Sequence, residues 1–96
     1  MRLITWRPLK KSAAAHPDAA APLLAWRRVA TRAQWASFAH VRADYNSADQ
    51  VGRFTVFNIG GNKYRLVTTI HFNTRRVFIR AILTHKEYDR GHWKND

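Results

Sequence analysis

The sequence contains no cysteine, which removes several kinds of chemistry from consideration. A chain without thiols forms no disulfide, binds no metal through thiolates and has no cysteine nucleophile. Acidic residues are also few, because 6 Asp and Glu stand against 17 Lys and Arg, and they are scattered along the chain. Scattered carboxylates provide no clustered ligand set for a metal ion. We therefore expect a protein that works without a metal or another cofactor.

Long hydrophobic runs are missing as well. No segment approaches the roughly 18 apolar residues of a transmembrane helix, and no secretory signal peptide is visible. A cytoplasmic protein is the expectation. The 96 residues suffice for one small domain over 1–96 and leave no room for a catalytic domain beside a binding module. One fold must therefore provide both binding and any catalysis.

What the sequence has in abundance is positive charge and apolar residues. The formal net charge is +11, and 46% of the residues are hydrophobic, among them four Trp and five Phe. The apolar content predicts a folded core. The charge favours a polyanionic partner, since such a surface attracts phosphates over long range and releases counterions on binding. Nucleic acid fits this description better than a membrane surface.

The N-terminal half has helical periodicity after a short opening strand over 2–5. Pro8 lies near the first turn of a predicted helix that runs to about His16, where its missing N–H does no harm. Asp18 is predicted to cap a second helix that ends near Arg32. The apolar stripe of this helix comprises Leu23, Trp26 and Ala30. A shorter third element carries Trp35, Phe38, Val41 and Tyr45 at helical spacing. Residues 46–49 are interpreted as a loop.

The C-terminal half predicts three antiparallel strands, over 54–59, 64–72 and 76–84, because these segments are rich in β-branched and aromatic residues. Residues 60–63, which include two glycines, are suited to close the first hairpin. The predicted fold class is α+β, with N-terminal helices packed on one face of a small antiparallel sheet.

A register for the second hairpin follows if Asn73 and Thr74 form a two-residue loop, because Arg65 then lies opposite Ile82. One sheet face becomes almost wholly apolar and is expected to pack against the helices. Its residues are Tyr64, Leu66, Thr68, Ile70, Phe72, Val77, Ile79, Ala81 and Leu83. The other face, here called the arginine face, carries Arg65, Val67, Thr69, His71, Phe78, Arg80, Ile82 and Thr84.

Arg65 and Arg80 converge on the arginine face in this register. With Val67 opposite Arg80, the two arginines are diagonal neighbours, roughly 7 to 8 Å apart at the backbone. At that spacing both guanidinium groups are expected to bind one phosphodiester. Asn58 is expected opposite Arg65 on the neighbouring strand.

Three segments carry a family resemblance. Residues 56–67 read VFNIGGNKYRLV, and they are followed by VFIR at 77–80 and LTHKEYD at 83–89. These motifs closely resemble the HigB family of RelE-like toxins, and the resemblance extends over essentially the whole chain. It implies the RelE-like microbial ribonuclease fold and a type II toxin that inhibits translation by cleaving mRNA in the ribosomal A site. It also implies a HigA-type helix-turn-helix antitoxin as partner.

The resemblance further suggests site residues. Arg65 and Arg80 would bind phosphate while the ribose 2′-hydroxyl attacks the adjacent phosphorus, and His85 would serve as acid or base. Lys63, Lys86 and Tyr88 are its expected assistants. Further RNA contacts are expected from Asn58, Asn62 and His71. Some relatives use a carboxylate base on the sheet, and no acidic residue occupies an equivalent strand position here, so the identity of the base stays open.

Two other hypotheses about the function remain. One is a non-catalytic RNA-binding module whose basic sheet binds ribosomal RNA without cutting it, although the paired-aromatic signature of common RNA-recognition modules is missing. The other is a toxin-like protein that serves only as a structural partner of its antitoxin. Arg65→Ala and Arg80→Ala should each abolish toxicity under the enzyme hypothesis.

Overall fold

The computed structural model describes residues 1–4, 15–61 and 63–95, and its centre is a five-stranded sheet in the order β1-β5-β4-β3-β2. The strands are β1 (Arg2–Ile4), β2 (Asp49–Val51), β3 (Phe54–Ile59), β4 (Tyr64–His71) and β5 (Arg76–Thr84). The helices are η1 (Pro17–Ala19), α2 (Ala20–Arg32), α3 (Phe38–Asp44), α4 (His85–Arg90) and η2 (His92–Asn95). β1 runs parallel to β5, and all other neighbours are antiparallel. The α+β prediction is therefore confirmed.

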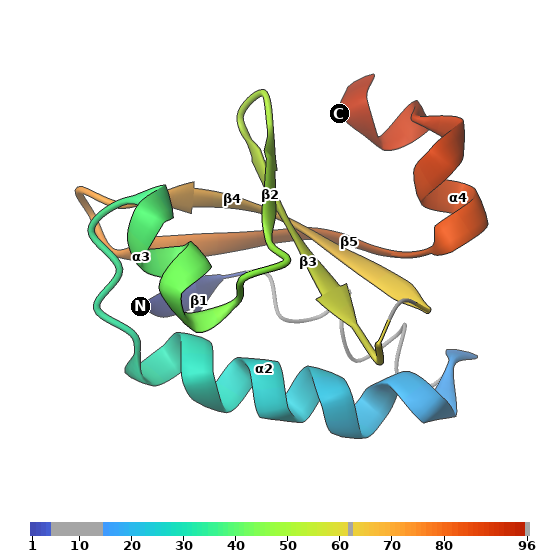
Figure 1. Ribbon diagram of the computed structural model, residues 1–96, viewed down its shortest axis with the longest axis horizontal. Coiled ribbons are helices and arrows are strands. Elements are labelled where there is room, and N and C mark those ends of the chain that lie inside the picture. The colour runs from blue at the N-terminus through green and yellow to red at the C-terminus, as the bar shows by residue number, and fades with distance from the viewer. Residues whose placement is uncertain (5–14, 62, 96) are drawn as a thin grey trace.

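The main core lies between α2 and one face of the sheet (Figure 1). The predicted helical stripe is confirmed, because Leu23, Trp26 and Ala30 are all buried on α2. The ring of Phe57 packs against Trp26 and Trp35, with centroids 5.4 Å and 6.0 Å apart. The helix predicted over 8–16 falls almost wholly outside the described residues. No helix within the described ranges is long and apolar enough to cross a membrane.

The prediction that Asp18 caps α2 is wrong. The short helix η1 precedes α2 directly, and Ala19 is the N-cap residue. The carboxylate of Asp18 instead accepts a hydrogen bond from the Tyr64 hydroxyl at 2.6 Å and lies 3.5 Å from the Lys63 Nζ. These contacts fix the start of α2 to the start of β4. The hydrogen bond from Tyr64 is the main cause that holds the pKa of Asp18 below its usual range.

The predicted bounds of β3 and β5 are confirmed, and β4 ends one residue earlier than expected, at His71. Asn58 lies opposite Arg65, as predicted. Residues 46–49 were expected to form a loop throughout, but Asp49 begins the short edge strand β2. The sequence did not predict this strand, because it spans only three residues and pairs only with β3.

The predicted register of β4 and β5 is correct near the turn and wrong beyond it. His71 lies opposite Arg76 and Thr69 opposite Phe78, but Val67 lies opposite Ala81, and Arg65 lies opposite Leu83. A β-bulge at Arg80 causes the shift, because one strand contributes an extra residue that has no partner.

The bulge moves Ile82 to the helix-covered face, where it joins the main core, and leaves Ala81 and Leu83 on the arginine face. Arg80 stays on the arginine face, since its Nε donates a hydrogen bond to the Thr69 hydroxyl at 3.1 Å.

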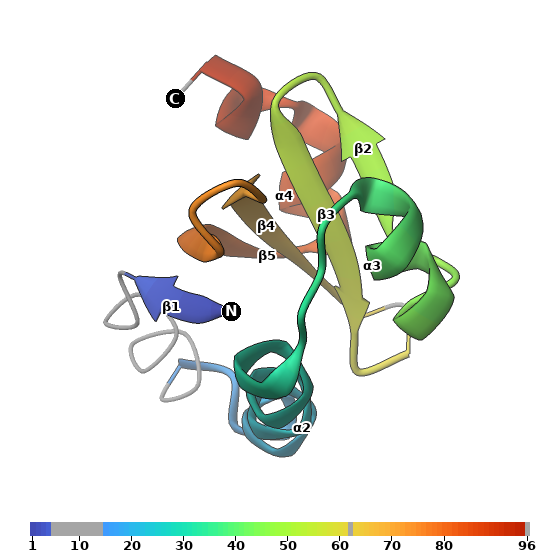
Figure 2. The same ribbon diagram turned by 90° about the vertical axis from the view of Figure 1, so that its left-hand side faces the viewer.

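The arginine face is partly covered. α4 and η2 lie on the opposite side of the sheet from α2 (Figure 2). There Trp93 buries a second apolar cluster that includes Phe54, Val56 and Val67. The turn between β4 and β5 lies at the other end of the sheet, away from α4 (Figure 1). The arginine face is therefore divided into a walled end near α4 and an uncovered end near this turn.

Candidate functional site

A polar hollow of about 420 Å³ lies at the walled end of the arginine face. Its lining residues come from α3, the following turn, β2, β3, β4 and α4: Arg42, Asn46, Ser47, Ala48, Asp49, Val56, Asn58, Arg65 and Tyr88. Two arginines, one carboxylate and one phenol thus share one concave surface. Such a set is suited to bind a phosphate group and to move protons beside it.

Arg65 is the central cation of this hollow. Its side chain projects from β4, beside Asn58 on β3, and is half-buried. The guanidinium carbon lies 5.7 Å from the centroid of the Tyr88 ring, and Nη1 donates a hydrogen bond to the Tyr64 carbonyl at 3.3 Å. A cation held against an aromatic face loses little side-chain freedom when it binds an anion. Arg65 is therefore held in a position suited to binding an anion.

Tyr88 is fixed by the C-terminal segment. Its ring stacks on Trp93, with centroids 4.9 Å apart and planes 15° from parallel, and the Trp93 Nε1 donates to the Tyr88 carbonyl at 2.9 Å. Burial raises the pKa of the Tyr88 hydroxyl, and the negative charge of Asp49 raises it further, while Arg65 acts in the opposite direction. The hydroxyl therefore remains protonated at neutral pH and is available as a proton donor.

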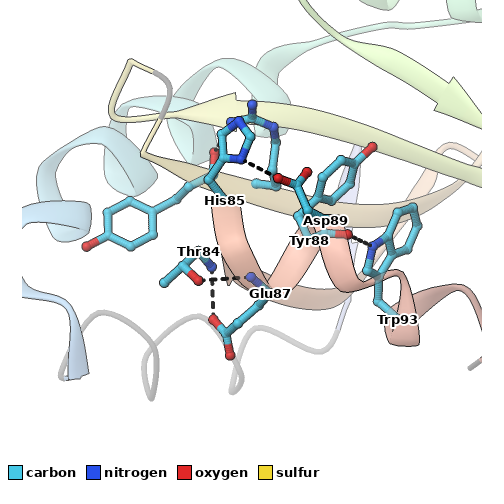
Figure 3. Close-up of polar contacts among 8 residues, drawn as sticks. Thr84, His85, Glu87, Tyr88, Asp89 and Trp93 are labelled. Atoms are coloured by element: carbon cyan, nitrogen blue, oxygen red, sulfur yellow. Dashed lines mark hydrogen bonds and ion pairs between the residues drawn. The ribbon is translucent and has the colours of Figure 1, made fainter.

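α4 begins with a capping box that determines where its side chains lie (Figure 3). The Thr84 hydroxyl accepts a hydrogen bond from the Glu87 backbone N–H at 3.2 Å, and the Glu87 carboxylate accepts one from the Thr84 N–H at 2.9 Å. β5 thus ends at Thr84. His85 becomes the first residue of the helix, where its exposed imidazole lies 3.0 Å from the carboxylate of Asp89.

The capping box predicts a pH-dependent contribution to stability. The hydrogen bond from the Thr84 N–H lowers the pKa of Glu87 in the folded protein. A carboxylate with a lowered folded-state pKa stabilises the fold above its unfolded value, and this contribution is lost as the pH falls through the folded value. Glu87→Gln should therefore lower the free energy of unfolding at pH 7, and the difference from the parent chain should shrink below about pH 4.

Urea denaturation of both chains at several pH values measures this difference. Thr84→Ala serves as the matched variant, with an expected loss of about 1 kcal/mol at neutral pH. A Glu87→Gln effect that is the same at pH 3 and pH 7 would contradict the assignment.

The structure gathers only some of the predicted site residues in the hollow, namely Asn58, Arg65 and Tyr88. Arg80 and His71 lie on the same face toward the uncovered end. The predicted diagonal pairing of Arg65 with Arg80 is wrong, because the bulge separates the two positions. Lys63 lies just before β4, where it pairs with Asp18. Lys86 is exposed on α4. Asn62 lies outside the described residues.

Six lining residues were not predicted as site residues from the sequence: Arg42, Asn46, Ser47, Ala48, Asp49 and Val56. All except Val56 lie in the stretch from α3 to the first residue of β2, for which the sequence predicted only a short helical element and a loop. Asp49 matters most, because it places a carboxylate on a strand beside Arg65 and Tyr88. A signal was present, since an acidic residue in so basic a chain is uncommon, but nothing local predicted that this residue would face the sheet.

These features define a class of protein: a small, basic α+β protein whose sheet carries a cationic, tyrosine-lined hollow. Residues 19–91 match the family model HigB_toxin, described as the RelE-like toxic component of a toxin-antitoxin system, and the chain belongs to this family. As a toxin component it has an antitoxin as partner.

Curated relatives agree with this assignment. The chain is 33% identical over 92 residues to the mRNA interferase toxin HigB of Escherichia coli K12, a match that covers 93% of this chain and 88% of the relative. The mRNA interferase HigB of Shigella flexneri matches to the same extent. That of Escherichia coli O6:H1 is 27% identical over 93 residues, covering 94% of this chain and 90% of the relative. The predicted membership of the HigB family of interferase toxins is confirmed.

Proposed function

We propose that this chain is an endoribonuclease that cleaves mRNA on the ribosome, with the hollow around Arg65 as its active site. The observation that carries the proposal is the convergence of Arg65, Tyr88 and Asp49 on one concave surface. A phosphodiester needs positive charge to stabilise the pentavalent phosphorane, a base for the attacking hydroxyl and an acid for the leaving oxygen. The hollow offers one residue type for each role.

The reaction is a transfer within the RNA strand. The ribose 2′-hydroxyl gives its proton to a base, and its oxygen forms a bond to the adjacent phosphorus. The bond from phosphorus to the 5′-oxygen then breaks, and that oxygen takes a proton from an acid. The products are a 2′,3′-cyclic phosphate and a 5′-hydroxyl. Arg65 stabilises the negative charge of the phosphorane throughout.

Tyr88 and Asp49 are the proton-transfer residues that the hollow favours. Tyr88, whose raised pKa keeps it protonated, is suited to protonate the leaving oxygen, and the Asp49 carboxylate is suited to accept the proton of the 2′-hydroxyl. His85 was the sequence-based candidate for acid or base. It adjoins the hollow through α4 without lining it, so its proposed role is to exchange protons between solvent and Tyr88.

Mapping of mRNA 5′ ends by primer extension after brief induction in a translating system tests the proposed function. New ends inside codons are the expected result, and they should vanish when translation initiation is blocked beforehand. A folded, expressed chain that produces no new ends would overturn the proposal and favour a non-catalytic RNA-binding module.

Cleavage is predicted to proceed without a divalent metal in the active site. The base, acid and phosphorane-stabilising cation are all side chains in this proposal, so no Lewis acid is needed. Cleavage of purified mRNA-programmed ribosomes should leave a 2′,3′-cyclic phosphate, and replacing Mg²⁺ with Co(NH₃)₆³⁺ to maintain the ribosomes should leave the rate unchanged. A rate that falls under these conditions and recovers on adding Mn²⁺ would contradict the prediction.

The proposed partner is a HigA-type helix-turn-helix antitoxin that binds α2. Trp26 and Trp35 are 1% and 3% exposed and belong to the core, so they offer no contact surface. The large apolar side chains that α2 exposes are Leu24 and Val29, at 47% and 41%. An antitoxin bound there would leave Arg65 uncovered and block entry to the ribosome by its bulk.

Co-expression with the neighbouring open reading frame and a pull-down test the existence of the complex. Leu24→Lys should weaken it at least tenfold, because a buried ammonium group at an apolar contact has no partner. Lys86→Gln, on the far side of the sheet, is the control. Hydrogen-exchange protection centred on Arg65 and Tyr88 would overturn the proposed binding surface.

A further inference from the structure

The uncovered end of the arginine face carries a second cluster of cationic and aromatic side chains. The register places Arg2, Arg76 and His71 in one row across β1, β5 and β4, and Phe78 and Thr69 occupy the next row. Residues paired across neighbouring strands share a face and lie about 5 Å apart. Together with the bulge residue Arg80, the cluster comprises Arg2, His71, Arg76, Phe78 and Arg80, here called the hairpin patch.

The aromatic part of the hairpin patch has an ordered geometry. The rings of His71 and Phe78 have their centroids 5.0 Å apart and lie 68° from parallel, with His71 exposed and Phe78 half-buried. Arg80 is held beside them, since its Nε donates to the Thr69 hydroxyl. Two neighbouring rings on an accessible, charged sheet surface are the arrangement that proteins use to stack the bases of single-stranded nucleic acids.

The charges of the patch favour an anionic ligand. Arg2, Arg76 and Arg80 are all exposed, and no carboxylate of the described chain forms an ion pair with any of them. Three guanidinium groups around two rings do not suit a protein core or an apolar docking surface. Burying them against an apolar partner would leave their charges without a counterion or a hydrogen-bond acceptor. An RNA strand supplies both a π-face for the rings and phosphates for the arginines.

The position of the patch connects it to the hollow. His71 lies six residues beyond Arg65 on β4, which corresponds to about 20 Å of strand. Both positions lie on the same face, and the buried cluster of Trp93 and Val67 stands between them. A strand of RNA that has its phosphodiester beside Arg65 and passes beside Trp93 reaches the patch a few nucleotides away.

We propose that the hairpin patch is a second binding site for the substrate RNA strand, in which bases stack on the His71 and Phe78 rings, one base to each ring, and the arginines bind the flanking phosphates. The proposal rests on the proposed function in taking RNA as the ligand. It assigns to Phe78 a role in holding single-stranded RNA that its half-buried position alone does not require.

The test uses the full chain and 2′-O-methyl RNA, which cannot be cleaved, so that binding is measured apart from catalysis. Fluorescence anisotropy gives the affinity of a single-stranded oligonucleotide of about 12 nucleotides, long enough to reach both sites. A dinucleotide is too short to reach both sites at once, and its binding is measured by NMR titration. Phe78→Leu should weaken binding of the long oligonucleotide about tenfold, and Phe78→Tyr, which keeps the ring, should not.

Arg76→Ala is the second variant, and it keeps the proposal testable if Phe78→Leu perturbs the sheet. It should reduce the slope of log Kd against log salt by about one for the long oligonucleotide and leave dinucleotide binding unchanged. Arg32→Ala on α2 removes the same charge from the opposite side of the sheet and should have a smaller effect.

Three results would overturn the proposal: parent-like affinity of Phe78→Leu for the long oligonucleotide, equal losses for the long and short ligands, or weakened association with ribosomes while binding of the free oligonucleotide is unchanged. The last result would assign the patch to ribosomal RNA. An absence of mRNA cleavage by the parent chain would overturn the proposed function while leaving the length dependence of binding intact, so the two failures are distinguishable.

Discussion

Arg65→Ala should reduce the rate of mRNA cleavage by about 100- to 1,000-fold and abolish growth arrest while the protein remains folded. The guanidinium group lies in the hollow against Tyr88, where the proposed mechanism places the phosphorane charge, and its side chain is only half-buried. Arg65→Lys should recover part of the rate, because an ammonium group supplies the charge without the two-pronged hydrogen bonding of a guanidinium. Primer-extension kinetics on programmed ribosomes measure the loss, and circular dichroism confirms the fold.

Two arginine variants serve as comparisons for Arg65→Ala. Arg32→Ala removes the same charge from α2 and should cleave at the parent rate. Arg80→Ala was expected from sequence to be as damaging as Arg65→Ala. Because the bulge moves Arg80 out of the hollow, its loss should raise KM with little change in kcat. Growth arrest by a folded Arg65→Ala chain at the parent level would rule out the hollow as the active site.

Phe57→Ala should lower the free energy of unfolding by about 3 to 5 kcal/mol. Phe57 is fully buried, and its ring contacts Trp26, Trp35 and Tyr45, the last with centroids 5.3 Å apart. Removing it opens a cavity where α2, α3 and the sheet meet. Small domains are stable by only about 5 to 15 kcal/mol, so the variant should be partly unfolded at 37 °C. Urea denaturation monitored by tryptophan fluorescence provides the measurement.

Phe78→Ala is the matched control for the core prediction. It deletes the same ring from a half-buried position on the arginine face, where the remaining space opens to solvent, so its cost should be less than half that of Phe57→Ala. Similar losses for the two variants would show that Phe57 is not the centre of the core.

Local patterns in the sequence predicted the elements that carry the fold. Helical spacing identified the buried stripe of α2, and the alternating β-branched and aromatic residues identified β3, β4 and β5. Asn58 was placed opposite Arg65 by the turn residues alone. These predictions succeeded because each depends on residues close together in the chain, where periodicity and turn chemistry determine the conformation.

The site was predicted less completely because it depends on contacts between distant segments. No local signal marks a bulge, yet the extra residue at Arg80 separated two arginines that a regular ladder would have paired. Asp49 entered the hollow only because β2 adds to the edge of the sheet. The strand register and a family resemblance pointed to Arg65, and the resemblance alone pointed to Tyr88. Only the structure shows the cation of one against the ring of the other.

The sequence by itself determined the charge of this protein, its fold class, its family and the strand that bears Arg65. The tertiary structure decided which parts of the arginine face are walled and which are accessible. Trp93 covers part of this face by packing on Phe54, with ring centroids 5.3 Å apart, although 38 residues lie between them in the chain. Burial of apolar surface drives such contacts and depends on area rather than on sequence separation, so only the folded chain shows where they form.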